Sequence, residues 1–410
     1  MVFRNKPLLE TTATAILILI TLISYSQKAR IIGKTINGKT NEPVPFANIY
    51  FNGTSIGTAS DSLGRFEIND VPVEYSELIA SSIGFNTLSA NLQLVTNKTT
   101  LVEFKMTADV TMLSSIVIRD KRDKRWESLY NDFCNYFIGQ TSNSKLTTII
   151  NPEVLDLDYD PSTKILTASA LEPLQLENLA LGYHISIALE KFEASSEHHS
   201  IQFKSYFKTI IPKNELEALQ WQKNRIETFK GSKRHFFLSL ITGVIDQQGF
   251  TVQKSSIGSH AALSEFNQNG DLGSYSLNLK TKDLLLDSTE GDFKVMEPGI
   301  FKISHRRSDE DLDGKSVTRS WIEVNDSYLN IYSNGIVKLP ANFWLLGYFE
   351  ELRLADQLPS DYNYWEEEMK LLRTLNSRRG KLIGVVRDEN DNPLRDATIF
   401  INNGLSLIHI

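Results

Sequence analysis

Residues 43–68 read PVPFANIYFNGTSIGTASDSLGRFEI. Two apolar segments, Phe46–Phe51 and Phe66–Ile68, are separated here by glycines and other turn-forming residues. Short segments of this kind recur roughly every eight to twelve residues over residues 29–107, which is typical of an all-β sandwich. We therefore predict such a sandwich over residues 29–107.

Four turn positions in this region have expected structural roles: Gly53, Gly57, Asp61 and Gly64. A glycine fits where the backbone needs a positive φ or leaves no room for a Cβ. Asp61 is expected to accept hydrogen bonds from the backbone of the turn that ends at Gly64. Calcium binding by Asp61 is the alternative, but no second acid lies close by. Earlier in the chain, Asn37-Gly38 predicts a tight hairpin turn with positive φ.

These residues occur in an order that resembles the carboxypeptidase regulatory-like domain. The matching positions are Ile32-Gly33, Pro43, Ala47-Asn48-Ile49, Gly53-Thr54, Gly57-Thr58, Asp61, Gly64, Phe66 and the stretch Ala80–Phe85. The resemblance implies a transthyretin-like sandwich without catalytic activity. Such domains stand in front of exported enzymes, surface proteins and outer-membrane TonB-dependent receptors.

The N-terminus has the features of an export signal. Basic residues near the start precede an apolar run over residues 13–23, which is too short to span a bilayer comfortably. Small residues then precede a cleavage site between Ser26 and Gln27. We predict a cleaved signal peptide at residues 1–26, with an uncleaved anchor helix as the alternative. The protein is therefore expected in the periplasm, in the outer membrane or at the cell surface.

Composition narrows the remaining possibilities. At 410 residues the chain is long enough for two or three domains. Its formal net charge of −7, with acids and bases interspersed, argues against binding of nucleic acid, which needs a concentrated positive surface. The single cysteine, Cys134, lies among aromatic residues and is expected to be a buried, inert thiol.

The middle of the chain has a different pattern. Residues 108–125 are expected to be a charged linker, and residues 126–370 an α+β domain. Apolar residues at helical spacing predict an amphipathic helix that packs on a sheet: Trp126, Leu129, Phe133 and Phe137. Further predicted helices are Asn214–Phe229 and a segment capped by Ser232 that ends near Gly249; predicted strands are Tyr183–Glu190, Tyr275–Leu279, Trp321–Val324 and Tyr328–Tyr332.

This region resembles the part that follows the regulatory-like domain in exported proteins of Gram-negative bacteria. The matching stretches are Ile150-Asn151-Pro152, Leu181-Gly182-Tyr183, Arg225–Phe237 and Ala355–Tyr362. No activity follows from this resemblance.

The name of the domain family raises the question of a zinc carboxypeptidase site. None of the seven histidines is followed by Glu at the spacing that a zinc carboxypeptidase needs, so peptidase activity is not supported. A nucleophile elbow, a phosphate-binding glycine loop and a dinucleotide fingerprint are also absent from the sequence. We therefore expect no catalytic residues and no cofactor.

Two weaker candidate sites remain. Asp309, Asp311 and Asp313 match the start of a calcium loop, but Ser320 replaces its bidentate Glu, which favours a hairpin turn instead. Basic residues at the start of a predicted helix could bind an anion, although a solvated face is the favoured interpretation: Arg225, Lys233 and Arg234.

The far end repeats the first domain. Pro393–Ile399 matches Pro43–Ile49 with the same spacing, so residues 380–404 are interpreted as the start of a second regulatory-like sandwich. Residues 405–410 are interpreted as a tail that is not native. The predicted fold class is therefore multi-domain and β-rich: a transthyretin-like sandwich, an α+β domain and a truncated second sandwich.

The function predicted from the sequence is that of a non-catalytic cell-envelope protein whose sandwich modules serve binding or spacing. Its partners would be other envelope proteins or glycans. Two alternatives stay open: the periplasmic front of a TonB-dependent outer-membrane receptor, and a hydrolase with an accessory regulatory-like domain.

Overall fold

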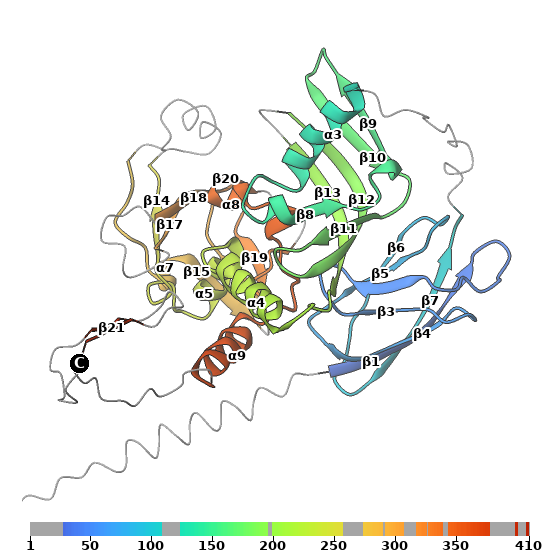
Figure 1. The fold of residues 1–410 in the computed structure, drawn as a ribbon, viewed down its shortest axis with the longest axis horizontal. Coiled ribbons are helices and arrows are strands. Elements are labelled where there is room, and N and C mark those ends of the chain that lie inside the picture. Colours follow the sequence, from blue (N-terminus) through green and yellow to red (C-terminus); the bar gives the residue numbers. More distant parts are fainter. Residues whose placement is uncertain are drawn as a thin grey trace, which may run out of the picture. The chain divides into compact units, whose positions relative to one another are not determined.

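The structure is a computed structural model (Figure 1). It describes residues 28–108, 124–195, 199–256, 274–289, 292–306, 317–325, 327–338, 343–377, 398–400 and 407–409. The chain divides into two compact units, residues 1–364 and residues 365–410. The first unit is β-rich with several sheets, as the sequence predicts.

The first unit begins with a β-sandwich of two sheets. One sheet has the order β4-β1-β7, in which β1 pairs with β4 antiparallel and with β7 parallel; the other has the order β3-β2-β5-β6. The strands are β1 (Lys28–Asn37), β2 (Asn48–Phe51), β3 (Gly57–Ala59), β4 (Arg65–Pro72), β5 (Glu77–Ser81), β6 (Leu88–Asn91) and β7 (Thr99–Met106). Side chains alternate between core and solvent, so that Phe66 and Ile68 are buried while Arg65 and Glu67 are exposed.

The turn after β1 differs from the predicted one. The loop is closed by the Asn37 N–H, which donates to the Glu42 carbonyl at 2.8 Å, and the positive φ of 60° falls on Asn41 and not on Gly38. The prediction of a tight Asn37-Gly38 hairpin turn was therefore wrong. Asn tolerates the left-handed region better than most residues, so Asn41 can supply it in a longer loop.

The next part is a six-stranded sheet, with the path β8-β11-β12-β10-β9 and β13 paired to β12. Its elements are α3 (Lys124–Phe137), η1 (Ser144–Leu146), β8 (Thr147–Ile149), η2 (Pro152–Val154), β9 (Leu155–Asp160), β10 (Ile165–Ala170), β11 (Leu174–Asn178), β12 (Tyr183–Ala194) and β13 (His199–Thr209). Helix α3 lies against this sheet (Figure 1), and Phe133 and Phe137 pack on Phe192. The predicted aromatic stripe is therefore the buried face of α3.

Two further sheets and the following helices complete the first unit. The sheets have the orders β14-β17-β18-β20 and β15-β16-β19. The elements are α4 (Glu215–Phe229), α5 (Lys233–Ile241), β14 (Phe250–Lys254), α7 (Thr281–Leu284), β15 (Leu285–Thr289), β16 (Asp292–Val295), β17 (Gly299–Arg306), β18 (Val317–Val324), β19 (Leu329–Tyr332), β20 (Phe343–Gly347), α8 (Tyr348–Glu351) and η3 (Leu354–Asp356). Phe236 and Phe237 of α5 are fully buried in the core that these sheets share.

The predicted cap by Ser232 is confirmed, and two of the predicted elements are corrected. The Asn214 and Ser232 side chains accept the backbone N–H groups that cap α4 and α5. However, α5 ends at Ile241, because Gly243 then adopts a φ of 77°. Residues 275–279 are not a regular strand: they meet β14 and the residue after it only through two isolated bridges, and the Leu277 side chain is 91% exposed.

The second unit is described only in part. It contains most of α9 (Tyr364–Ser377), where Lys370 pairs with Glu366 at 2.9 Å, and the short antiparallel pair β21 (Thr398–Phe400) and β22 (Leu407–His409). None of the helices in the described ranges is both long and apolar enough to cross a membrane.

Several sequence predictions fall outside the described residues. They are the signal peptide at residues 1–26 with its Ser26–Gln27 cleavage site, most of the linker at 108–125, the calcium candidates Asp309, Asp311 and Asp313, and nearly all of the second sandwich and the tail.

Candidate functional site

The sandwich and the α+β region meet through main-chain hydrogen bonds. The Gly53 N–H donates to the Ser205 carbonyl at 2.8 Å, and the Phe207 N–H donates to the Thr54 carbonyl at 3.0 Å. Thr54 and Tyr206 thereby form a parallel bridge between a sandwich turn and β13. We call this contact the junction; it comprises Asn52–Ser55, Lys204–Phe207 and, from a second loop, Ser360 and Asp361.

Aromatic stacking covers one side of the junction. The Tyr50 and Tyr206 rings stack with centroids 4.9 Å apart and an interplanar angle of 15°, and both residues are buried with Ile79. Burial raises the pKa of the Tyr50 and Tyr206 phenols above the ordinary tyrosine value. Because the rings are desolvated only when both parts are in contact, this packing stabilises the junction.

Gly57 makes this close packing possible. A Cβ at Gly57 would lie 2.7 Å from the Ile49 carbonyl oxygen and 2.8 Å from the Tyr206 ring. The glycine therefore serves close approach rather than a positive φ. By contrast, Gly53 and Gly64 do have positive φ angles, of 73° and 72°.

A charged pair lies beside the stacked rings. Lys204 donates to Glu77 at 2.7 Å, and the other oxygen of this carboxylate accepts the Asn52 side-chain amide at 2.8 Å. The Asn52 oxygen in turn accepts the Ser205 N–H at 3.0 Å. The network therefore connects β5, the sandwich turn and β13.

A double-mutant cycle on Glu77→Ala and Lys204→Ala tests this network. Both side chains are mostly buried, at 29% and 20% exposed, so we expect a coupling energy of about 1 kcal/mol. The more exposed Glu103–Lys105 pair, 3.6 Å apart, is the control and should show a much smaller coupling. If chemical unfolding gave equal coupling energies for the two pairs, the Glu77–Lys204 pair would not stabilise the junction.

The second loop of the junction is held by the partly buried guanidinium of Arg234. The Ser360 N–H donates to the Gly53 carbonyl at 2.7 Å, and Asp361 accepts the Ser55 N–H at 2.8 Å and the Ser55 hydroxyl. Arg234 donates to the carbonyls of Pro359, Ser360 and Tyr362 and, from Nε, to that of Asn334 at 2.9 Å; the Nη1 bond to Pro359 is 3.0 Å long. Arg234 therefore fixes the loop that binds the sandwich turn.

The three basic residues considered as a possible anion site have other partners. Arg225 donates to the Leu181 carbonyl at 2.7 Å and lies over the Tyr183 ring at 4.3 Å. Arg234 is occupied by the carbonyls just described, and Lys233 lies 5.7 Å from the centre of the Phe343 ring, where burial lowers the pKa of its amine. These contacts favour structural roles over a shared anion site.

Asp61 organises the turn before β4. It accepts the Leu63 and Arg65 N–H groups at 2.9 and 2.8 Å and pairs with the Arg65 guanidinium. The hydrogen bonds from Arg65 hold the pKa of the Asp61 carboxyl below its usual range. At Gly64, a Cβ would lie 2.4 Å from the Thr35 carbonyl oxygen. Within the described residues, no group of three His, Cys, Asp or Glu side chains could hold one metal ion.

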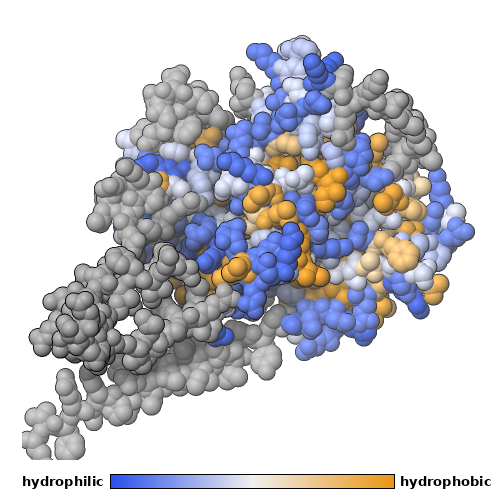
Figure 2. Space-filling model, viewed as in Figure 1, coloured by the Kyte–Doolittle hydropathy of each residue, from blue (hydrophilic) through white to orange (hydrophobic). Residues whose placement is uncertain are grey.

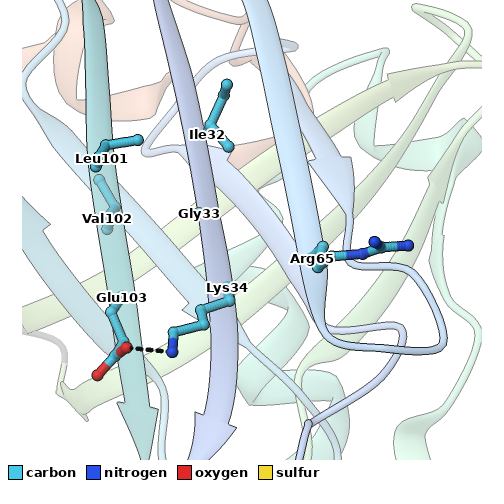
Figure 3. Close-up of a pocket in the computed structure, with 7 residues that line it drawn as sticks. All are labelled: Ile32, Gly33, Lys34, Arg65, Leu101, Val102 and Glu103. Atoms are coloured by element: carbon cyan, nitrogen blue, oxygen red, sulfur yellow. Dashed lines mark ion pairs between the residues drawn. The ribbon is translucent and has the colours of Figure 1, made fainter.

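A shallow hollow of about 390 Å³ lies on the sheet β4-β1-β7 (Figure 3). Ile32 and the 78% exposed Leu101 lie near each other, and Lys34 and Glu103 form an ion pair at 2.8 Å. Arg65 points away from these side chains. Because the one charged pair here is neutralised and Arg65 points away, the hollow lacks the converging polar groups that fix a ligand.

Apolar surface is also found outside the sandwich. Figure 2 shows apolar side chains gathered over the region of β11–β13, between hydrophilic ones. Exposed apolar residues beside β8 and β11 include Leu146, Ile150 and Leu179, at 53%, 56% and 40% exposure. Apolar atoms make up much of the surface of folded proteins in general, so this surface does not by itself define a site.

Comparison with known proteins identifies the sandwich. The family model of the CarboxypepD_reg-like domain matches residues 31–118, which extends past Thr107, where the sequence pattern places the end of the sandwich. No curated protein matches the chain. A Bacteroides uniformis protein, provisionally assigned as carbohydrate binding, is 9% identical over 45% of this chain and 99% of its own, with a TM-score of 0.17.

A membrane-associated protein of unknown function from Bacteroides fragilis, also a provisional assignment, is 10% identical over 74% of this chain and 92% of its own, with a TM-score of 0.16. At these TM-scores neither structure bears on the fold or the role of the chain. The matched residues include the turn residues and strands β2–β7 of the two-sheet sandwich described above. The chain is therefore a carboxypeptidase regulatory-like domain-containing protein, with that domain at residues 31–118.

Proposed function

We propose that the chain is an exported, non-catalytic protein of the cell envelope in which the regulatory-like domain is a spacing module held in a fixed position on the α+β region. The observation that supports this is the junction, where Gly53 and Thr54 bond to the backbone of β13. A module joined only by a linker would be free to reorient. A module bonded through its turn keeps a set distance and direction from the rest of the protein.

Two further contacts add to this fixed position. The stacked Tyr50 and Tyr206 rings are buried at the junction, and the Ser360–Asp361 loop, held by Arg234, binds the same turn. Neither the receptor alternative nor the hydrolase alternative is favoured by a specific feature of the described residues.

Hydrogen exchange on the intact chain tests the spacing role. The Gly53, Phe207 and Ser360 N–H groups should be protected together, and Gly57→Val should remove that protection, because its side chain collides with Tyr206. Gly84→Ala, where a Cβ would meet nothing within 4 Å, is the matched control and should leave it unchanged. Rapid exchange of all three amides in the wild-type chain would exclude a fixed junction.

Fractionation tests export. Expressed in a Gram-negative host, the chain should be recovered outside the cytoplasm, and its mass should correspond to a mature N-terminus at Gln27. Leu17→Arg places a charge in the apolar run and should leave the full-length chain in the cytoplasm. Retention of the unprocessed wild-type chain in the cytoplasm would refute the envelope assignment.

A further inference from the structure

Phe46 has an unusual conformation for an aromatic residue. Its φ is 57°, in the left-handed region, and its side chain is 70% exposed, although the next residue, Ala47, is completely buried. A bulky residue rarely adopts this backbone conformation, because its Cβ is crowded there. Strain of this kind in an exposed loop points to a role for the side chain.

Ser60 fixes the backbone on both sides of Phe46. Its carbonyl accepts the Phe46 N–H at 3.1 Å, and its N–H donates to the Ala47 carbonyl at 2.9 Å. Its hydroxyl accepts the Ala47 N–H at 2.9 Å and donates to the Val44 carbonyl at 3.1 Å. Ser60 is itself buried, so the conformation at position 46 is set by the surrounding fold and not by the phenylalanine.

The chain contains a second version of this segment. Pro393–Ala397 repeats Pro43–Ala47 with the same spacing, and Asp396 stands at the position of Phe46. Aspartate enters the left-handed region more readily than most residues do. Aspartate at this position therefore suits a left-handed backbone, whereas the first copy of the segment has an exposed phenylalanine ring there.

The turn next to this segment carries an exposed apolar side chain and a neutralised pair of charges. Leu63, on the turn 61–64, is 56% exposed, and this turn adjoins the segment: a Cβ at Gly64 would lie 3.3 Å from the Pro43 side chain. The charges on this turn, Asp61 and Arg65, form an ion pair at 2.8 Å. We call Pro43–Phe46 with Leu63 the loop tip.

We propose that the loop tip binds a neutral polysaccharide, with the Phe46 ring stacked on the C–H face of a sugar. A flat exposed ring offers that face a large apolar contact, while the sugar's hydroxyls stay in water. Because Asp61 and Arg65 neutralise each other, the adjacent turn gives an ionic ligand little advantage.

This proposal gives the sandwich a binding role in addition to its spacing role, and it does not use the junction. Failure of the binding experiment would therefore leave the hydrogen-exchange result at the junction unaffected, and the reverse also holds.

Affinity electrophoresis of the intact chain in gels containing starch, laminarin, xylan or mannan tests the proposal. At least one of these polysaccharides should retard the wild-type chain, and Phe46→Asn should weaken that binding by about tenfold or more. Phe46→Asn should also raise Tm by a few degrees, because asparagine relieves the strain. Loss of binding in a more stable variant would separate a ligand contact from a folding defect.

Two variants serve as controls. Leu101→Ser removes an equally exposed apolar side chain from the sheet face and should leave retardation unchanged, whereas Phe46→Trp should preserve it. Three results would overturn the proposal: no retardation of the wild-type chain by any of the four polysaccharides, equal retardation of Phe46→Asn, or Phe46-dependent sedimentation with phosphatidylethanolamine–phosphatidylglycerol vesicles in the absence of polysaccharide binding.

Discussion

Replacing Arg234 with alanine should lower the free energy of unfolding by about 4 kcal/mol. The guanidinium donates to the carbonyls of Asn334, Pro359, Ser360 and Tyr362. Hydrogen bonds from a charged donor contribute more than neutral ones, and truncation leaves several half-buried carbonyls without this donor. The loop that binds Gly53 and Ser55 would then lose its support.

Urea unfolding followed by tryptophan fluorescence measures this loss, and two variants calibrate it. Arg234→Lys keeps the charge but not the planar fork, so it should lose about half as much. Arg65→Ala removes a surface ion pair whose arginine side chain is 68% exposed, and should change stability by less than about 1 kcal/mol. A similar small change for Arg234→Ala would show that the carbonyl contacts do not support the loop.

Replacing Gly64 with alanine should destabilise the sandwich by about 3 kcal/mol or more. Its φ is 72°, and a Cβ would lie 2.4 Å from the Thr35 carbonyl oxygen, which belongs to β1 and cannot move aside cheaply. Gly84 has a φ of 81° but open space around it, so Gly84→Ala should cost only about 1 kcal/mol of backbone strain. The difference between the two variants isolates the steric contact.

Residue-resolved hydrogen exchange of the β1 amides measures both effects, because residues 29–107 contain no tryptophan. Equal losses of stability in Gly64→Ala and Gly84→Ala would contradict this prediction. They would show that the backbone shifts and so relieves the contact with the Thr35 carbonyl oxygen.

Features that depend on neighbouring residues were predictable from the sequence. The buried stripe of α3, the alternation in β12 and the caps of α4 and α5 all follow from patterns a few residues long. The same patterns failed for residues 275–279, where apolar alternation is present but the segment meets its neighbouring chain only through isolated bridges. Alternation shows which side chains could share a face, and does not ensure a partner strand.

The junction could not be predicted, because its partners are far apart in the sequence. Arg234 is visible as one charge in a basic run, but its acceptors include carbonyls 125 to 128 residues away. A carbonyl has no side-chain signature, so such a contact leaves no mark in the residue pattern. Phe46 is different: its alignment with Asp396 was a signal in the sequence that the position favours a left-handed backbone.

The bridge between Thr54 and Tyr206 also has an evolutionary consequence. Its hydrogen bonds join backbone groups, which every residue except proline can supply, so sequence drift on either side need not break them. For the bridge itself, what selection must keep is the space at Gly57 and the course of the turn. A homologous sandwich with those two properties could therefore be transplanted onto the same strand, and this interchangeability would let a lineage exchange its front module while retaining the architecture behind it.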